Sequence, residues 1–164
     1  MAPTPTRRAA PRIDVLVESQ RWKKTPDIKA VVRRAIGAAA ARLSTPPAEV
    51  AIVLTDDSAI HLLNRTWRRV DAPTNVLSFP TQSATGAPHL LGDIVLAYET
   101  IAAEAKTEHK PFAHHVAHLA VHGFLHLLGY DHERKQDATT MERLERDILQ
   151  GLGVPDPYRL ADKA

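Results

Sequence analysis

The stretch from Pro111 to His132 reads PFAHHVAHLAVHGFLHLLGYDH. Its apolar residues are spaced as on a helix, and proline is favoured at the first position of a helix. We therefore predict a long apolar helix from Pro111 to about Leu128 that supplies much of the core. Gly129 is well placed to end this helix, because glycine readily adopts the left-handed conformation found at many helix C-termini.

Histidine is concentrated in the same stretch. Seven of the nine histidines fall between residues 109 and 132, where an even spread would put about one, and the chain has no cysteine. In a chain without thiols, such clustering indicates metal ligation by imidazole or proton chemistry.

The spacing of three histidines favours a metal site. His122 and His126 are four residues apart, so both project from one face of the predicted helix, about one turn from each other. The turn at Gly129 would bring His132 back toward them. Three neutral imidazoles leave one tetrahedral position of a zinc ion open for water or substrate. We thus predict one zinc ion held by His122, His126 and His132; a buried helix with incidental histidines is the alternative.

Other polar residues near these three are expected to have lesser roles. His118 lies one turn before His122, so it is predicted to support a ligand or to face the substrate, with a packed core histidine as the alternative. Asp131 is interpreted as a turn residue or a hydrogen-bond partner of a ligand histidine. Three further histidines are expected mostly at the surface: His109, His114 and His115.

The pattern His-x-x-x-His-x-x-Gly-x-x-His resembles that of the metzincin metallopeptidases. In those enzymes the general-base glutamate directly follows the first histidine. Gly123 occupies that position here. Peptide hydrolysis by that mechanism would lack its base, so the peptidase hypothesis is less favoured.

Length and composition indicate one globular domain. The chain has 164 residues, of which 44% are hydrophobic and 24% charged, values typical of a single packed core. The formal charge of +2 does not by itself indicate a nucleic-acid-binding protein. No apolar run approaches the ~20 residues that span a membrane, and the N-terminus lacks the apolar core of a secretory signal. We expect a cytoplasmic protein that does not bind membranes.

Strands and helices are predicted to alternate, which argues for a single α/β (or α+β) domain. The expected strands are Ile13–Val17, Val50–Leu54, Asn75–Phe79 and Ile94–Ala97. The near-continuous apolar run Val50–Leu54 suggests a strand covered on both faces. Besides the histidine-bearing helix, the expected helices are one capped by Thr25 with Pro26 as its first residue, one capped by Asp57 or Ser58, Glu99–Lys106 and Asp137–Gln150. The domain is assigned to residues 13–158, with a disordered basic tail at 1–12 and a short tail at 159–164.

The block from His122 to His132 is similar, almost throughout, to the signature of the YbeY family of bacterial endoribonucleases. Other segments agree with that family: Leu63-Asn64, Trp67-Arg68, Asp71–Pro80, Leu91–Ile94, and the end of the chain from Met141 through Glu145 to Tyr158. The resemblance covers roughly residues 13–158. Trp67 stands where a tyrosine is commoner in the family, and Asn75 where an aspartate is commoner.

The resemblance implies a single-strand-specific, metal-dependent endoribonuclease. It implies action in maturation of small-subunit ribosomal RNA, notably at its 3′ end, and in ribosome quality control. It also implies a small mixed sheet packed with about five helices, and a metal site that opens into a positively charged cleft. Carried over to this chain, the zinc ligands are His122, His126 and His132, and the functional arginine is Arg68. The expected partners are single-stranded RNA, the small ribosomal subunit and ribosome-associated proteins.

Several points stay open at the level of sequence. Ser78 and Asp93 are expected to line the cleft. Either water or the 2′-hydroxyl of the RNA can be the nucleophile. Two alternatives to an endoribonuclease are a metallohydrolase of another substrate class, such as peptide, and a non-catalytic ribosome assembly factor with a structural metal.

Overall fold

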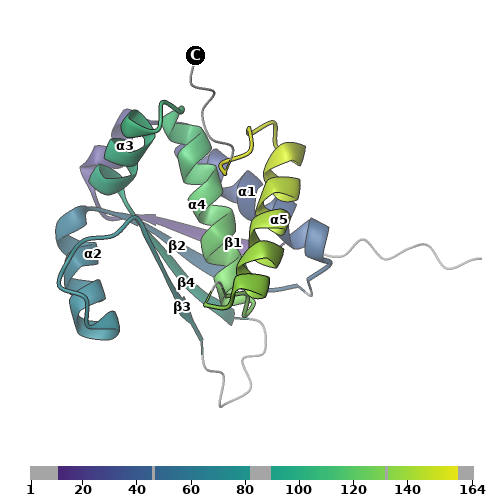
Figure 1. The fold of residues 1–164 in the computed structure, drawn as a ribbon. Coiled ribbons are helices and arrows are strands. Elements are labelled where there is room, and N and C mark those ends of the chain that lie inside the picture. The colour runs from purple at the N-terminus through teal and green to yellow at the C-terminus, as the bar shows by residue number, and fades with distance from the viewer. Residues whose placement is uncertain (1–10, 46, 82–89, 132, 159–164) are drawn as a thin grey trace, which may run out of the picture.

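A four-stranded mixed sheet forms the centre of the fold (Figure 1). The computed structural model describes residues 11–45, 47–81, 90–131 and 133–158. The strands are β1 (Arg12–Val17), β2 (Glu49–Thr55), β3 (Val76–Pro80) and β4 (Leu90–Ala97), in the order β1-β2-β4-β3. Strands β1, β2 and β4 run parallel to one another, whereas β3 pairs antiparallel with β4 at one edge of the sheet. The mixed sheet confirms the expected fold class.

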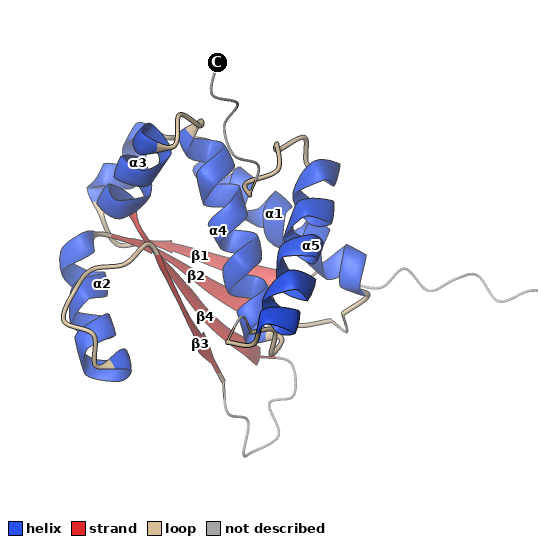
Figure 2. Ribbon diagram, in the orientation of Figure 1, coloured by secondary structure: helices blue, strands red, loops and turns tan. Residues whose placement is uncertain are grey.

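Five α-helices and two shorter helical turns, within the described ranges, pack on this sheet (Figure 2). The α-helices are α1 (Ile28–Leu43), α2 (Asp57–Leu63), α3 (Tyr98–Thr107), α4 (Phe112–Leu127) and α5 (Lys135–Gly151). The turns are η1 (Gln20–Lys24) and η2 (Asn64–Arg68), the latter a wide turn of the π type that continues α2. None of these helices has the length and apolar character to cross a membrane.

The two faces of the sheet are covered by different helices. Because successive side chains of a strand point to opposite faces, Ile94 and Leu96 of β4 face the large core formed with α1 and α4. The alternate residue Val95 faces a smaller cluster built around Ile60 of α2. Strand β2 is accordingly covered on both faces, as predicted, although Val53 remains half-buried on the α2 side.

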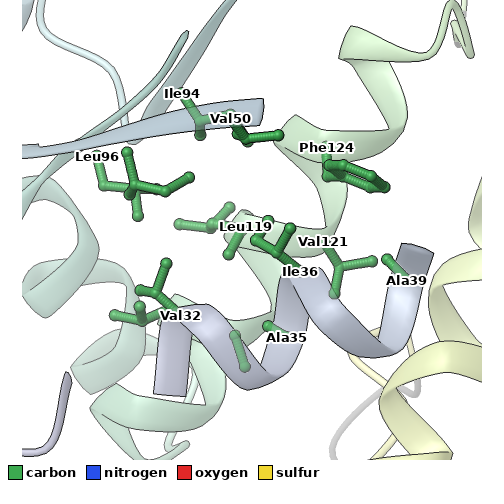
Figure 3. Close-up of a cluster of buried hydrophobic side chains, with 14 of the residues drawn as sticks. Val32, Ala35, Ile36, Ala39, Val50, Ile94, Leu96, Leu119, Val121 and Phe124 are labelled. Atoms are coloured by element: carbon green, nitrogen blue, oxygen red, sulfur yellow. The ribbon is translucent and has the colours of Figure 1, made fainter. Parts of the chain in front are cut away.

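The large core lies between the sheet and α4 (Figure 3). Phe124 and Leu125 of α4, Ile36 of α1 and Leu96 of β4 are all fully buried. Each such side chain contributes about 1.5–3 kcal/mol of transfer free energy. The predicted role of the histidine-bearing helix as core is confirmed. The helix ends as expected, with Gly129 at a φ of +96°.

The starts of two helices differ from the prediction. Helix α1 begins at Ile28, and the Thr25 hydroxyl instead donates to the carbonyl of Trp22, 3.0 Å away, at the end of η1. Helix α2 is capped by Asp56, whose carboxylate accepts from the Ala59 backbone N–H at 2.9 Å. Asp57 instead contacts α3, where its carboxylate accepts from the Thr100 hydroxyl at 2.7 Å. The predicted caps at Thr25 and at Asp57 or Ser58 are therefore wrong.

The predicted tails fall largely outside the described residues. Residues 1–10 and 159–164 are not among them. Strand β1 already begins at Arg12, whose backbone N–H donates to the Ala48 carbonyl at 2.8 Å.

Close packing at Gly123 holds α4 against the sheet. A Cβ atom at this position would lie 2.8 Å from Cγ2 of Ile94 and 3.0 Å from Oγ of Ser78. Both distances are far inside ordinary contact. Only glycine therefore lets α4 approach β3 and β4 this closely.

Replacing Gly123 with alanine is expected to lower the free energy of unfolding by about 1–3 kcal/mol, because the methyl group overpacks the interface. Urea denaturation measures this change. Gly37→Ala in α1 is the matched control, since a Cβ there meets nothing within 4 Å. That variant is expected to gain up to ~1 kcal/mol from helix propensity. Equal effects in the two variants would contradict the close-packing argument.

Candidate metal centre and cleft

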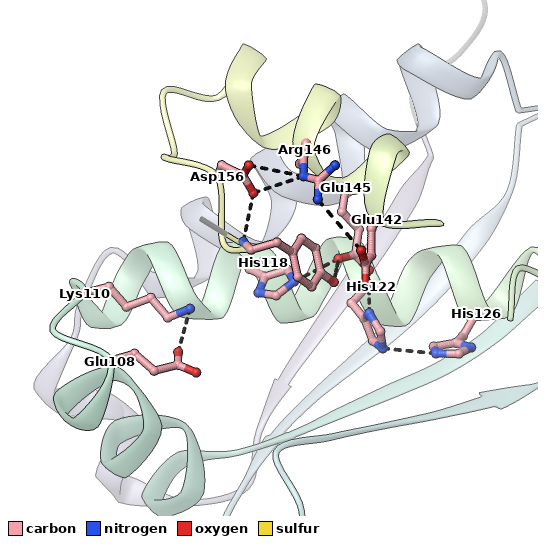
Figure 4. A network of polar contacts seen from close by, with 10 residues as sticks. Glu108, Lys110, His118, His122, His126, Glu142, Glu145, Arg146 and Asp156 are labelled. Atoms are coloured by element: carbon pink, nitrogen blue, oxygen red, sulfur yellow. Dashed lines mark hydrogen bonds and ion pairs between the residues drawn. The ribbon is translucent and has the colours of Figure 1, made fainter. Parts of the chain in front are cut away.

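Three imidazoles form a row along α4. His118, His122 and His126 are spaced by four residues and lie on the same side of the helix (Figure 4). The Nε2 atoms of His122 and His126 are 3.1 Å apart. The prediction that these two histidines project from one face is confirmed.

The buried carboxylate of Glu145, on α5, anchors this row. Its Oε1 lies 2.5 Å from Nδ1 of His122, and its Oε2 lies 3.0 Å from Nε2 of His118. The Tyr158 hydroxyl also donates to Oε2. Glu145 is completely buried, and a carboxylate without solvent must have such partners because an unpaired buried charge is very costly.

Glu145 remains ionised in this environment. Burial alone would raise its pKa, but the hydrogen bonds that it accepts from His118 and His122 outweigh burial and lower the pKa to about 2. Burial and the bond to Glu145 raise the pKa of Tyr158 well above its usual range, so the phenol stays a hydrogen-bond donor. Glu145 is thus an acceptor for all three partners.

This arrangement fixes the tautomer of His122. Because Glu145 accepts from Nδ1–H, the lone pair of His122 is on Nε2, the atom that faces His126. Imidazole ligands of metals are commonly oriented in this way by a carboxylate on the other ring nitrogen. Two nitrogens bound to one tetrahedral zinc ion lie about 3.3 Å apart. The 3.1 Å separation observed here therefore suits a shared ion.

A second grouping of the same side chains could also hold a metal ion. One ligand atom from each of His118, His122 and Glu145 lies within 4.8 Å of the others. In this grouping, however, both Glu145 oxygens already accept hydrogen bonds. In the pair His122 and His126, the His122 atom that faces His126 is Nε2, whereas Glu145 contacts Nδ1 on the other side of the ring. His132, the predicted third ligand, lies outside the described residues.

The two histidines line a cleft of about 520 Å³. Arg68, Ser78 and Asp131 line the same cleft, so the structure brings the segment from η2 to β3 together with the end of α4 and the turn after it. Asp131 also accepts from the Glu133 backbone N–H at 3.3 Å, a contact typical of a turn residue.

Asp93 is not among the residues that line the cleft. It is exposed and pairs with Phe79 in the sheet. Because Ile94 faces α4, the pleat of the strand directs Asp93 to the opposite face.

Arg68 is held at the sheet edge by two contacts. Its guanidinium donates to the Ser78 carbonyl at 2.6 Å and lies 5.2 Å from the centroid of the Phe79 ring. The Ser78 hydroxyl in turn donates to the Gly123 carbonyl of α4 at 2.8 Å. Strand β3 thus fixes the position of Arg68 relative to the histidine-bearing helix.

Gly123 also bears on the peptidase alternative. The glutamate that follows the first histidine in metzincins would need a side chain at this position, where a Cβ alone would already lie 2.8 Å from Cγ2 of Ile94. A glutamate at residue 123 would therefore have to displace α4 from β3 and β4, and Gly123 itself carries no general base.

Sequence reasoning assigned no role to two residues of the site, Glu145 and Tyr158. The available signal for Glu145 was its place on α5, where it lies in an otherwise apolar stripe with Met141, Ile148 and Leu149. A charged residue there must be buried with partners. Tyr158 gave no comparable signal, because its contact depends on how the chain folds back after α5.

One surface assignment was wrong. His115 is 4% exposed, and its Nε2 lies 3.0 Å from Oε1 of Glu104. Desolvation lowers its pKa despite this bond. The amide of Asn75 donates to the same carboxylate oxygen at 2.9 Å, so the uncommon asparagine at position 75 is accommodated by an acidic partner. His109 is exposed and His114 half-buried.

Comparison with known proteins gives several matches. A family model described as Endoribonuclease YbeY matches residues 15–153. A protein named Endoribonuclease YbeY from Bradyrhizobium diazoefficiens is 54% identical over 156 residues, which cover 90% of this chain and 85% of the relative. A relative of the same name from Rhodopseudomonas palustris (strain BisB18) is 52% identical, covering 96% of this chain and 98% of its own. A solution structure from Thermotoga maritima matches with a TM-score of 0.49 and 23% identity, over 93% of this chain and 98% of that chain.

Replacing Glu145 with glutamine is expected to lower the free energy of unfolding by about 2–5 kcal/mol. The substitution removes the charge and turns an amide donor toward an imidazole N–H. Chemical denaturation in the presence of a chelator measures the change. Glu142→Gln, one turn earlier on α5 in an exposed ion pair with Arg146, is the control and should stay within ~1 kcal/mol of the wild type. A Glu145 variant as stable as this control would contradict the anchoring role.

Proposed function

Because the chain belongs to the YbeY family of endoribonucleases, we propose that it is a metal-dependent enzyme that cuts single-stranded RNA. It is a hydrolase that acts on RNA. In this proposal it acts in maturation of small-subunit ribosomal RNA, at the 3′ end, and in ribosome quality control. One zinc ion would be held by His122, His126 and His132. A cytoplasmic location and ribosome-associated partners stay predictions from the sequence.

The observation that carries the proposal is the pair of imidazoles in an open cleft. The Nε2 atoms of His122 and His126 lie 3.1 Å apart, and both residues line the same cleft as Arg68. A divalent ion bound there would stabilise charge on the phosphoryl oxygens and increase the acidity of water. The cleft gives a phosphodiester access to the site, which favours a catalytic over a purely structural metal.

Two further side chains, Glu145 and Arg68, would assist the reaction in different ways. Glu145 holds His122 in the tautomer and orientation that present Nε2 to the cleft. Arg68 provides a planar, permanently charged group suited to phosphate. Its bond to the Ser78 carbonyl uses one of the five N–H donors of a guanidinium and fixes its position. The charge that develops on the phosphate would therefore meet donors that are already in place.

The nucleophile is either water or the 2′-hydroxyl of the RNA. Attack by the 2′-hydroxyl leaves a cyclic phosphate on the product, whereas attack by water leaves a linear one. Analysis of the ends of a cleaved RNA distinguishes the two routes.

His126→Ala is expected to lose bound metal and to reduce cleavage of single-stranded RNA at least ~100-fold, because even changes behind the ligands commonly cost 10–100-fold. Elemental analysis and a cleavage assay are run on the same preparation. The control is His114→Ala, a half-buried histidine on the same helix that does not line the cleft. A folded His126 variant without metal that still cuts at the wild-type rate would refute the proposed mechanism.

Arg68→Glu is expected to keep the metal and to lower kcat/KM about 10²–10³-fold, the usual cost of losing one preorganised donor. The same assays apply. Arg33→Glu, at an exposed position on α1, changes the net charge equally and should cleave as the wild type does. Loss of metal from the Arg68 variant would show that Arg68 supports the metal centre rather than the phosphate.

A further inference from the structure

The two tryptophans of the chain have opposite environments. Trp22 is 1% exposed, packs against Tyr98 and Phe112, and donates its ring N–H to the Thr55 carbonyl at 2.7 Å. Trp67, on η2, is 66% exposed. The core accounts for Trp22. It does not account for Trp67, whose large aromatic surface is left in solvent.

Trp67 lies in a positively charged surface. Three exposed arginines share its segment, Arg65, Arg68 and Arg69. The acidic residue that follows, Asp71, lies 2.7 Å from Nε2 of His61. The combination of an exposed aromatic ring and arginines is typical of surfaces that bind single-stranded nucleic acid, where bases stack on the ring and cations meet the phosphates.

Hydrogen bonds on both sides of Trp67 hold the backbone of its turn in place. The side-chain amide of Asn64, which is 6% exposed, donates to the Ala72 carbonyl at 2.9 Å. The Asn64 carbonyl accepts from the Val70 N–H at 3.2 Å. Arg68 is held to the Ser78 carbonyl at the other side. A ring presented by a fixed turn loses little conformational freedom when a ligand binds.

We propose that Trp67 is a stacking platform for a base of single-stranded RNA whose backbone continues from the metal cleft past Arg68. This inference rests on the proposed endoribonuclease function and deepens it. Arg68 lines the cleft, whereas Trp67, the residue before it on η2, is not among the lining residues. The exposed ring therefore lies beside the cleft, next in the chain to the residue that would hold the phosphate. Stacking needs an accessible base face, which a duplex hides. Trp67 therefore favours single-stranded over double-stranded substrate.

The fluorescence of the protein offers a direct test, since Trp67 is the exposed one of its two tryptophans. Mixing the wild-type holoenzyme with an oligouridylate should quench emission before turnover. An oligomer of the same length without bases should not. In Trp67→Phe the remaining emission comes from buried Trp22 and should not respond to RNA. Equal quenching by the oligomer without bases would overturn stacking and leave only charge attraction.

Cleavage kinetics provide the second test. Trp67→Ala should raise the KM for single-stranded RNA about 5- to 150-fold, the range expected for losing one stacked base, with kcat changed less than about twofold because the contact is remote from the reacting atoms. Trp67→Phe should recover much of the loss. The control is Leu16→Ala, another exposed apolar residue, on β1 at the far edge of the sheet.

The outcomes separate this proposal from the function on which it rests. If the wild type does not cleave RNA, the proposed function fails. If the wild type cleaves and Trp67→Ala has an unchanged KM, the stacking platform alone is refuted, and the surface is then better explained as a contact for a protein.

Discussion

The buried carboxylate of Glu145 is the interaction on which the site depends. Glu145 accepts hydrogen bonds from His122, His118 and Tyr158 in a region without solvent. Through them it joins α4, α5 and the segment after α5. The geometry at the cleft follows from this contact, because the proton on Nδ1 of His122 leaves Nε2 as the atom that faces His126. The packing of α4 against α5 and the orientation of His122 therefore depend on the same buried carboxylate.

A second constraint, the absence of a side chain at Gly123, brings the two halves of the cleft together. Without a Cβ, α4 lies directly against Ser78 of β3. The same strand residue holds Arg68 through its carbonyl. Strand β3, at the edge of the sheet, thus contacts both Arg68 of η2 and the histidine-bearing helix α4. A peptidase-like glutamate and this packing are mutually exclusive at residue 123.

Local sequence patterns predicted the elements well and their ends less well. Helical periodicity and the i, i+4 spacing were enough to place His122 and His126 on one face. The N-cap of α2 was misassigned because Asp56 and Asp57 are equivalent as local signals. What separates them is a tertiary contact, the bond from the Thr100 hydroxyl to Asp57. His115 was misassigned for the same reason, since its partner Glu104 lies on α3.

The sequence by itself determined the fold class, the row of imidazoles on one helix and the family to which the chain is similar, because spacing along one element and short motifs are local information. Tertiary structure alone decided the strand order, the approach of Arg68 to the histidines and the role of Glu145. Glu145 and His122 are 23 residues apart in the chain. No periodicity links them. Their contact exists only because α4 and α5 pack together and a buried charge must find partners within hydrogen-bond reach.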